Sequence, residues 1–330
     1  MKIFYTACIF SYLISLNPVA VAATSCYATA SDLVFGNISM GSAANSSASV
    51  SIECNTFDLS LLATARVRMC LNLGAGLASG STINLRSMNT LALVPLQFQI
   101  YRDAALTQVL GDTPVDDIDI DLEYSVPILG GSGTKNLSIY GYVPPQLNLA
   151  AASYLSVFSG GHTRLDYRYA ERLLGTPSWP ASCTSGGNGG GSIIFPFNAT
   201  ATVAASCVID IANNLNFGSI SGLINSHHDH TTDVSFTCTK NTPWSLSLDH
   251  GLHYTSERRM RNNATGQFVS YQLYRDSGRT LPWGDTPGID TVNGSGSGSS
   301  QTQTVYGRVP APQSVASGNY SDTITVTITY

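Results

Sequence analysis

The fold of this chain is decided by a stretch that occurs twice. Residues 96–114 read LQFQIYRDAALTQVLGDTP, and residues 269–287 read VSYQLYRDSGRTLPWGDTP. Both copies carry Tyr-Arg-Asp near the start and Gly-Asp-Thr-Pro at the end, with one constant offset between them. Internal similarity of this length indicates two copies of one domain in tandem.

The similarity extends to both sides of this core. Upstream, a cysteine followed by Leu-x-Phe-Gly occurs at Cys26 with residues 33–36, and again at Cys207 with residues 215–218. Downstream, Tyr-Gly-x-Val-Pro occurs at residues 140–144 and at residues 306–310. A length of 330 residues agrees with two domains of roughly 150 residues each.

Composition and patterning favour an all-β extracellular protein. Only 11% of the residues are charged, and the apolar residues fall in short runs between stretches rich in Gly, Ser and Thr. Residues 245–248 and 323–330 alternate polar with apolar side chains, a period typical of half-buried strands. The net charge of -5 offers no basic surface, so nucleic acid is not expected as a partner.

The first residues indicate the compartment and the domain limits. Residues 1–23 combine Lys2, an apolar stretch and small residues before Ala23, which together predict a secretory signal peptide. No later run approaches the ~20 apolar residues of a spanning helix, so we expect a soluble mature protein. We predict an N-terminal domain at residues 24–185, a Gly-rich linker at 186–191 and a C-terminal domain at 192–330.

After the signal peptide six cysteines remain, an even number that favours disulfides in an oxidising compartment. The second copy contains only two of them, and two cysteines of the first copy occupy the corresponding places. The repeat therefore predicts two equivalent bonds and leaves the last two cysteines to pair with each other. The predicted bonds are Cys26–Cys54, Cys207–Cys238 and Cys70–Cys183.

The second copy resembles the spore coat U-like domain, which is found in secreted bacterial proteins and in archaic chaperone-usher pili. The resemblance is carried by Cys207 before residues 215–218, by Tyr-Gln-Leu-Tyr-Arg-Asp at 271–276, by the motif at 306–310, and by Gly-Asn-Tyr-Ser-Asp-Thr at 318–323. The first copy matches less well, because it carries additional sequence around residues 57–70 and 160–183.

This resemblance implies two tandem immunoglobulin-like β-sandwiches, the second an incomplete pilin-type sandwich that awaits a donor strand. The implied partners are a periplasmic pilus chaperone, an outer-membrane usher and the next pilus subunit. Only two or three mature residues precede Cys26, too few for a donor strand, so the expected place is the tip of the fibre. The protein then looks like a two-domain tip adhesin, secreted through the periplasm to the cell surface.

The end of the chain is the expected contact for a chaperone or donor strand. That set is Thr323, Ile324, Val326, Ile328 and Tyr330. The segment at residues 192–206 leaves two alternatives open, because it either completes the first domain from within the chain or forms the first strand of the second domain.

Binding is expected where the first copy departs from the second, through exposed hydrophobic loops that attach the bacterium to abiotic or host surfaces and support biofilm formation. The candidate surface residues are Leu91, Ala92, Leu93, Val94, Pro95, Leu77 and Trp179. A lectin-like pocket for a glycan is the alternative, with aromatic candidates at Tyr101, Tyr124, Tyr140, Tyr142, Tyr167 and Tyr169. A structural spore or cyst coat protein is a further alternative.

Catalytic and metal chemistry is sparse in the sequence. Asp117, Asp119 and Asp121 alternate with apolar residues and would suit calcium, but a solvated strand face is the preferred interpretation. The histidines at 227–230 are likewise interpreted as a solvated loop. With no nucleophile elbow or phosphate loop in the sequence, we predict a non-enzymatic protein without metal or cofactor.

Overall fold

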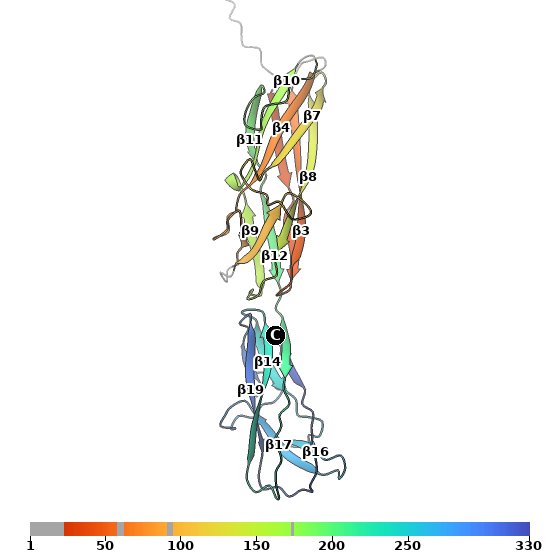
Figure 1. Ribbon diagram of the computed structural model, residues 1–330, viewed down its shortest axis with the longest axis vertical. Helices are drawn as coiled ribbons and strands as arrows, with labels where there is room; N and C mark the ends of the chain where they lie inside the picture. Colours follow the sequence, from red (N-terminus) through yellow and green to blue (C-terminus); the bar gives the residue numbers. More distant parts are fainter. Residues whose placement is uncertain (1–22, 58–62, 91–94, 173–174) are drawn as a thin grey trace, which may run out of the picture.

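The computed structural model describes residues 23–57, 63–90, 95–172 and 175–330. The regular structure of these residues consists of strands β1 to β20 and one short 3-10 helix at Gly160–His162. Figure 1 shows two strand-built bodies that lie end to end along the long axis of the molecule. The predicted all-β class with two tandem sandwiches is confirmed. Among the described residues, no helix has the length and apolar character to span a membrane.

One five-stranded sheet occurs in each half, with the same strand order. The first half has the order β1-β3-β8-β6-β5, and the second has β13-β14-β19-β17-β16. The strands of the first are β1 (Ala23–Ala30), β3 (Ala44–Phe57), β8 (Gly131–Val143), β6 (Leu96–Tyr101) and β5 (Arg86–Met88). Those of the second are β13 (Cys207–Ala212), β14 (His228–Cys238), β19 (Ser300–Val309), β17 (Phe268–Tyr274) and β16 (Arg258–Arg261). The sequence repeat is thus a repeat of topology.

The facing sheets differ between the halves. The first half has the orders β11-β10-β4-β7 and β2-β12-β9, whereas the second has only β18-β15-β20. The strands of the first half are β11 (Gly189–Ile194), β10 (Thr163–Arg172), β4 (Ala63–Leu73), β7 (Ile118–Val126), β2 (Leu33–Ile38), β12 (Phe197–Val203) and β9 (Ala152–Phe158). Those of the second are β18 (Val292–Ser295), β15 (Pro243–Leu248) and β20 (Val326–Thr329). No counterpart of β11 and β12 occurs in residues 207–330.

Two of the repeated motifs pack directly on each other. A Cβ atom built on Gly141 would lie 2.6 Å from the ring of Phe35 and 2.7 Å from Leu33, which is too close for any side chain. Gly307 has the same relation to Leu215 at 2.3 Å and to Phe217. Tyr-Gly-x-Val-Pro therefore needs its glycine so that Leu-x-Phe-Gly can lie across the sheet.

A buried arginine joins the two sheets in each half, and sequence reasoning did not find it. Arg86 is fully buried, and its guanidinium donates to the carbonyl oxygens of Leu73, Gly74 and Leu110 and to Gln99. Burial lowers the pKa of Arg86 to about 10, which still leaves the side chain protonated at neutral pH. Arg258 makes the same kind of contacts with carbonyl oxygens in the second half.

The segment before the second copy belongs to the first sandwich. β12 lies between β2, to which it is parallel, and β9, to which it is antiparallel. Phe195, Phe197, Ala199, Ala201 and Val203 are all buried in the first core. Of the two alternatives for residues 192–206, the structure therefore shows completion of the first domain from within the chain.

The predicted linker at residues 186–191 is wrong. Gly189–Ile194 form β11, which pairs with β10, so the strands of the first domain continue to Val203. The glycines have a packing reason, because a Cβ atom on Gly190 would lie 2.2 Å from the carbonyl oxygen of Tyr167. Glycine here permits close approach to a neighbouring strand rather than flexibility.

The two halves meet through a short connection and main-chain hydrogen bonds. Only residues 204–206 separate β12 from β13. The amide of Lys240 donates to Leu149, at 3.0 Å, and the carbonyl oxygen of Lys240 accepts from Ala151, at 3.1 Å. The opposite end of the first domain is its far end, where β3 ends at Phe57 and β7 turns into β8 (Figure 1).

Introducing a charge on the buried face of β12 should unfold the first domain. Ala199 is fully buried, so Ala199→Asp places a carboxylate in the core and should cost at least about 3 kcal/mol. Thr202→Asp, on the exposed face of the same strand, is the matched control and should change stability little. Thermal unfolding of both variants measures this. Equal melting temperatures would contradict the assignment of β12 to this core.

Candidate functional site

The second domain leaves open the place that β11 and β12 fill in the first. β20 pairs with β15 along one edge, with Leu246 opposite Ile328. No strand of residues 175–330 pairs with its other edge, and β13 contacts β20 at the place where β1 contacts β11 in the first domain. Leu215 to Ile220, the counterpart of β2, forms no strand, because the partner that would pair with it is absent.

Equivalent apolar residues are more exposed to solvent in the second domain than in the first. Leu33, Phe35 and Ile38 are 0%, 7% and 4% exposed beneath β12. Their counterparts Leu215, Phe217 and Ile220 are only half-buried. Within the described part of the second core, half-buried apolar residues are as numerous as buried ones, 13 of each, so this core is less completely covered than the first.

The residues predicted to contact a donor lie along this opening. Ile324, Val326 and Ile328 are half-buried and pack against the second core. Thr323 is exposed on the opposite face of the segment, and Tyr330, which falls on the same face as the three apolar residues, is exposed at the end of the segment. We call the surface formed by residues 323–330 together with Leu215, Phe217 and Ile220 the acceptor groove. Its backbone edge on one side and its apolar floor are the two features that a β-strand ligand requires.

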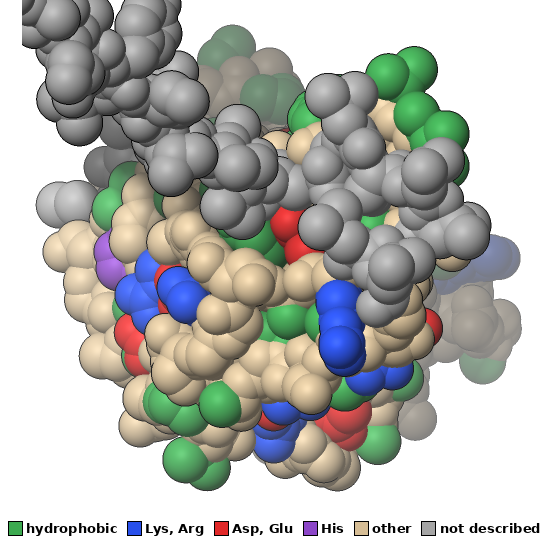
Figure 2. Space-filling model, turned by 90° about the horizontal axis from the view of Figure 1, so that it is seen from above, with side chains coloured by type: hydrophobic (Ala, Val, Ile, Leu, Met, Phe, Trp, Pro, Cys, Tyr) green, Lys and Arg blue, Asp and Glu red, His purple; other side chains and the backbone are tan. Residues whose placement is uncertain are grey.

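The far end of the first domain carries exposed hydrophobic side chains that sequence reasoning missed. Phe57 at the end of β3 is 73% exposed, and Ile128 and Leu129 in the β7–β8 hairpin are 56% and 74% exposed. β3 pairs Thr56 with Gly131, which sets Phe57 beside that hairpin. Figure 2 views the molecule from this end and shows hydrophobic side chains projecting at its edges. The apolar pair between Pro127 and Gly130 was the available signal in the sequence.

The structure describes three of the seven predicted surface residues, namely Pro95, Leu77 and Trp179. Leu91, Ala92, Leu93 and Val94 lie outside the described residues, so their role stays a prediction. Pro95 is exposed and precedes β6, close to Gln97, whose amide donates to Gln146 in the half of the domain that adjoins the second domain. Leu77 is 59% exposed beside β9, where its amide donates to Val157.

Trp179 has a structural role in addition to any contact with a ligand. Its ring lies 4.9 Å from the guanidinium carbon of Arg66 and 5.7 Å from that of Arg68, both in cation–π geometry. The same arginines donate to the carbonyl oxygens of Pro177 and Pro180. The half-buried Trp179 is therefore held against the outer face of β4.

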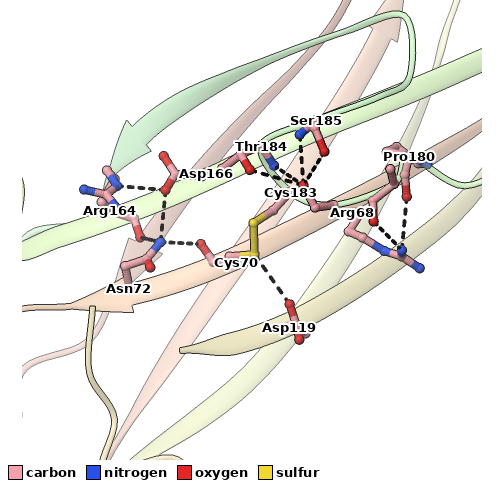
Figure 3. Close-up of a disulfide and its surroundings, with 12 residues drawn as sticks. Arg68, Cys70, Asn72, Asp119, Arg164, Asp166, Pro180, Cys183, Thr184 and Ser185 are labelled. Atoms are coloured by element: carbon pink, nitrogen blue, oxygen red, sulfur yellow. Dashed lines mark hydrogen bonds and ion pairs between the residues drawn. A yellow bond between two sulfur atoms is a disulfide. The ribbon is translucent and has the colours of Figure 1, made fainter. Parts of the chain in front are cut away.

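The structure contains the three disulfides that the repeat predicts, Cys26–Cys54, Cys70–Cys183 and Cys207–Cys238. The first and third join the equivalent strand pairs β1–β3 and β13–β14. Cys70–Cys183 has no counterpart in the second domain and ties the loop of Trp179 to β4 (Figure 3). Beside it lies a polar groove of about 800 Å³, lined mainly by charged side chains.

Comparison with known proteins identifies the family. The spore coat protein U domain model matches residues 12–159 and 193–327. The chain belongs to the spore coat protein U family. Protein U of Myxococcus xanthus is 34% identical over 148 residues, which cover 40% of this chain and 82% of that protein. Each half of the chain is one spore coat U domain, and the first is completed by β12.

Two of the solved structures that this chain matches are pilus proteins. One is the CsuC–CsuE chaperone–tip adhesion subunit pre-assembly complex of archaic chaperone-usher Csu pili from Acinetobacter baumannii, at 17% identity and a TM-score of 0.48, covering 93% of this chain and 100% of that one. The other is the CupB6 tip adhesin from Pseudomonas aeruginosa, at 12% identity and a TM-score of 0.31, covering 92% of this chain and 93% of that one.

Removing the disulfide that is specific to the first spore coat U domain should destabilise that domain alone. Cys70 and Cys183 are 113 residues apart, and closing a loop of that size is worth about 4 to 5 kcal/mol in the chain-entropy model. We expect Cys70→Ala with Cys183→Ala to lower the melting temperature and to expose the Trp179 loop to protease. Limited proteolysis with mass spectrometry checks this. Unchanged cleavage of that loop would show that the Arg66 and Arg68 contacts hold it without the disulfide.

Proposed function

We propose that this protein is a pilus tip adhesin whose second domain joins the fibre by accepting a donor strand. The observation that carries the proposal is the difference between two copies of one domain. The first copy has its missing strand supplied by β12, and the second has the same place open and lined by half-buried apolar residues. An incoming strand would bury these residues and satisfy the backbone edge of β20.

The direction of β12 indicates on which side of the second domain the next subunit of the proposed fibre would lie. β12 follows β11 within the first domain, runs along β9 towards the second domain, and is followed there by β13. A donor strand in the acceptor groove with the same direction would place the next subunit beyond the second domain. The far end of the first domain, with Phe57, Ile128 and Leu129, then points away from the fibre (Figure 1).

The partners follow from the open edge. An exposed edge strand with an apolar groove is an aggregation hazard, so it needs a partner from the moment of export. A periplasmic chaperone would supply the first strand, an outer-membrane usher would exchange it, and the next subunit would supply the permanent one. In this proposal the protein is displayed at the cell surface and contributes to attachment and biofilm formation.

Hydrophobic attachment is the proposed mode of binding. Burying about 100 Å² of apolar surface contributes roughly 2.5 kcal/mol before ordering costs, so a few exposed side chains on each of many fibres suffice. The glycan alternative has less support, because Tyr124 and Tyr167 are buried in the first core. The polar groove beside Cys70–Cys183 has no aromatic side chain among its described lining residues on which a sugar could stack.

A strand fused after Tyr330 should complete the second domain. β12 is antiparallel to β9, so a copy of residues 195–203 joined to Tyr330 by a short turn has the right direction to pair with residues 320–330. We expect a higher melting temperature and protection from protease. The control is the same fusion with aspartate at the positions of Ala199 and Ala201, which should have no effect. Equal stability of the fused, control and unfused chains would argue against an acceptor groove.

Polar substitutions at the far end should reduce attachment without preventing assembly. Phe57→Ser, Ile128→Ser and Leu129→Ser remove exposed apolar area and should lower adhesion to polystyrene several-fold. Val115→Ser is the matched control, since Val115 is 81% exposed but lies outside the far end. Electron microscopy confirms that fibres form, and a glycan array tests the alternative.

A parallel variant, Leu91→Ser with Leu93→Ser and Val94→Ser, tests the loop chosen from the sequence. Loss of adhesion in this variant alone would move the binding site from the far end to that loop.

A further inference from the structure

The outer face of the β10-β4-β7 sheet carries a series of ion pairs that stops at one carboxylate. Arg66 lies opposite Glu123, and Arg68 lies opposite Asp121, with nitrogen–oxygen distances of 2.6 Å and 2.9 Å. The next position of β4 in this series is Cys70, opposite Asp119. Asp119 Oδ1 is 3.5 Å from Cys70 Sγ, which is part of a disulfide and carries no proton or charge (Figure 3).

A second carboxylate lies beside it and is buried. Asp117 is 4% exposed, and its carboxylate borders the polar groove within 4.8 Å of the nearest Asp119 oxygen. Within the described residues, no other side chain forms a hydrogen bond to this carboxylate, and Arg102 donates instead to the backbone oxygen of Asp117. The solvated face predicted for Asp117 is therefore wrong, because the residue precedes β7 and points inward to the groove.

In the second domain, neutral residues occupy the positions that correspond to Asp117 and Asp119. Ser245 lies opposite Asn293 as Cys70 lies opposite Asp119. Arg275 donates to the backbone oxygen of Thr291 as Arg102 does to that of Asp117. Ser245 Oγ donates to Thr291 Oγ1 at 3.0 Å, and Thr291 Oγ1 donates to Asn293 Oδ1 at 3.3 Å. The neutral set satisfies itself, so the fold does not require the two carboxylates.

We propose that Asp117 and Asp119 bind a calcium ion in the groove beside the Cys70–Cys183 disulfide. Two carboxylates that face one opening suit a hard divalent cation, and the open groove lets water complete the six to eight oxygen ligands that calcium takes. Zinc and copper are disfavoured, because the neighbouring sulfur is in a disulfide and supplies no thiolate. The bound ion would supply the positive charge that the series of ion pairs lacks at this position.

The charged side chains around the groove support the proposed calcium site. Arg68 forms its ion pair with Asp121, and Arg164 forms its ion pair with Asp166 at 2.8 Å, so neither guanidinium forms an ion pair with Asp117 or Asp119. Lys135 of β8 also borders the groove, and its side chain is exposed. Burial raises the pKa of Asp117, and the neighbouring Asp119 and Asp116 raise it further, while Arg102 offsets only part of this rise. The remaining electrostatic cost is what a cation would relieve.

Calcium titration of the full mature chain tests the proposal. The protein is isolated from the periplasm with any accompanying chaperone, treated with EDTA and titrated with CaCl2 by calorimetry. We expect one saturable site, with a dissociation constant of about 0.1 to 1 mM, as in other extracellular modules. The melting temperature of the first domain should rise with calcium and fall again with EDTA. No saturable heat below ~10 mM, or tighter binding of Zn²⁺ than of Ca²⁺, would overturn the proposal.

Variants separate the site from general charge effects. Asp117→Thr with Asp119→Asn introduces the threonine and asparagine of the second domain while Cys70 stays in its disulfide. This variant should fold as well as the unmodified chain in EDTA while binding calcium more than tenfold more weakly. Asp121→Asn is the matched control, because Asp121 is paired with Arg68, and its affinity should change less than twofold. Unchanged calcium binding in the double variant would place the ion elsewhere. If Lys135 neutralises the pair, then Lys135→Ala will lower the melting temperature in EDTA, and the unmodified chain will not bind calcium.

Discussion

The unpaired edge of a β-sandwich is the constraint on which the rest of this structure depends. In neither copy do the repeated strands cover the whole core by themselves, so the backbone groups at the open edge and the apolar side chains beneath it favour a partner strand. In the first domain, β12 supplies both, and Leu33, Phe35 and Ile38 become buried. In the second domain, the corresponding residues remain half-buried.

The strand that completes the first domain also determines how the two domains are connected. Because only three residues separate β12 from β13, the segment that completes the first domain is also the connection to the second. The connection is stiffened by the main-chain bonds at Lys240. In the proposed fibre, the join between subunits would repeat the join between domains, with a separate chain in place of β12. The polarity of the molecule then follows from the direction of a single strand.

The two domains share a scaffold and differ in what was added to it. The shared motifs serve packing and turns: Gly141 and Gly307 allow Leu-x-Phe to cross the sheet, and Asp103 and Asp276 each accept hydrogen bonds from the backbone of the following turn. The additions are confined to the first domain. The Cys70–Cys183 bond, the arginines that hold Trp179, and the carboxylates Asp117 and Asp119 all lie on one outer face of its sheet. A surface rebuilt over an unchanged core is where a domain-specific role is expected.

The sequence by itself determined the features that local chemistry dictates. Period-two alternation, the repeated turn motifs and the cysteine positions were enough for the all-β class, the two domains and all three disulfides, because each depends on residue type at a fixed spacing. The alternation of residues 323–330 also predicted one wall of the acceptor groove, since it sets Ile324, Val326 and Ile328 on one face.

Tertiary structure alone decided where segments distant in sequence meet. The glycines at 189–191 look like a linker in the sequence, but their close approach to Tyr167 and Tyr169 makes them a strand. Phe57 and Leu129 are far apart in the chain, and only the pairing of β3 with β8 sets them at one end. Asp117 and Asp121 share an alternating pattern, yet Arg68 neutralises Asp121 while Asp117 is buried beside a disulfide. Alternation specifies a face of a strand, whereas the neighbours across the sheet, which determine charge and burial, come from other parts of the chain.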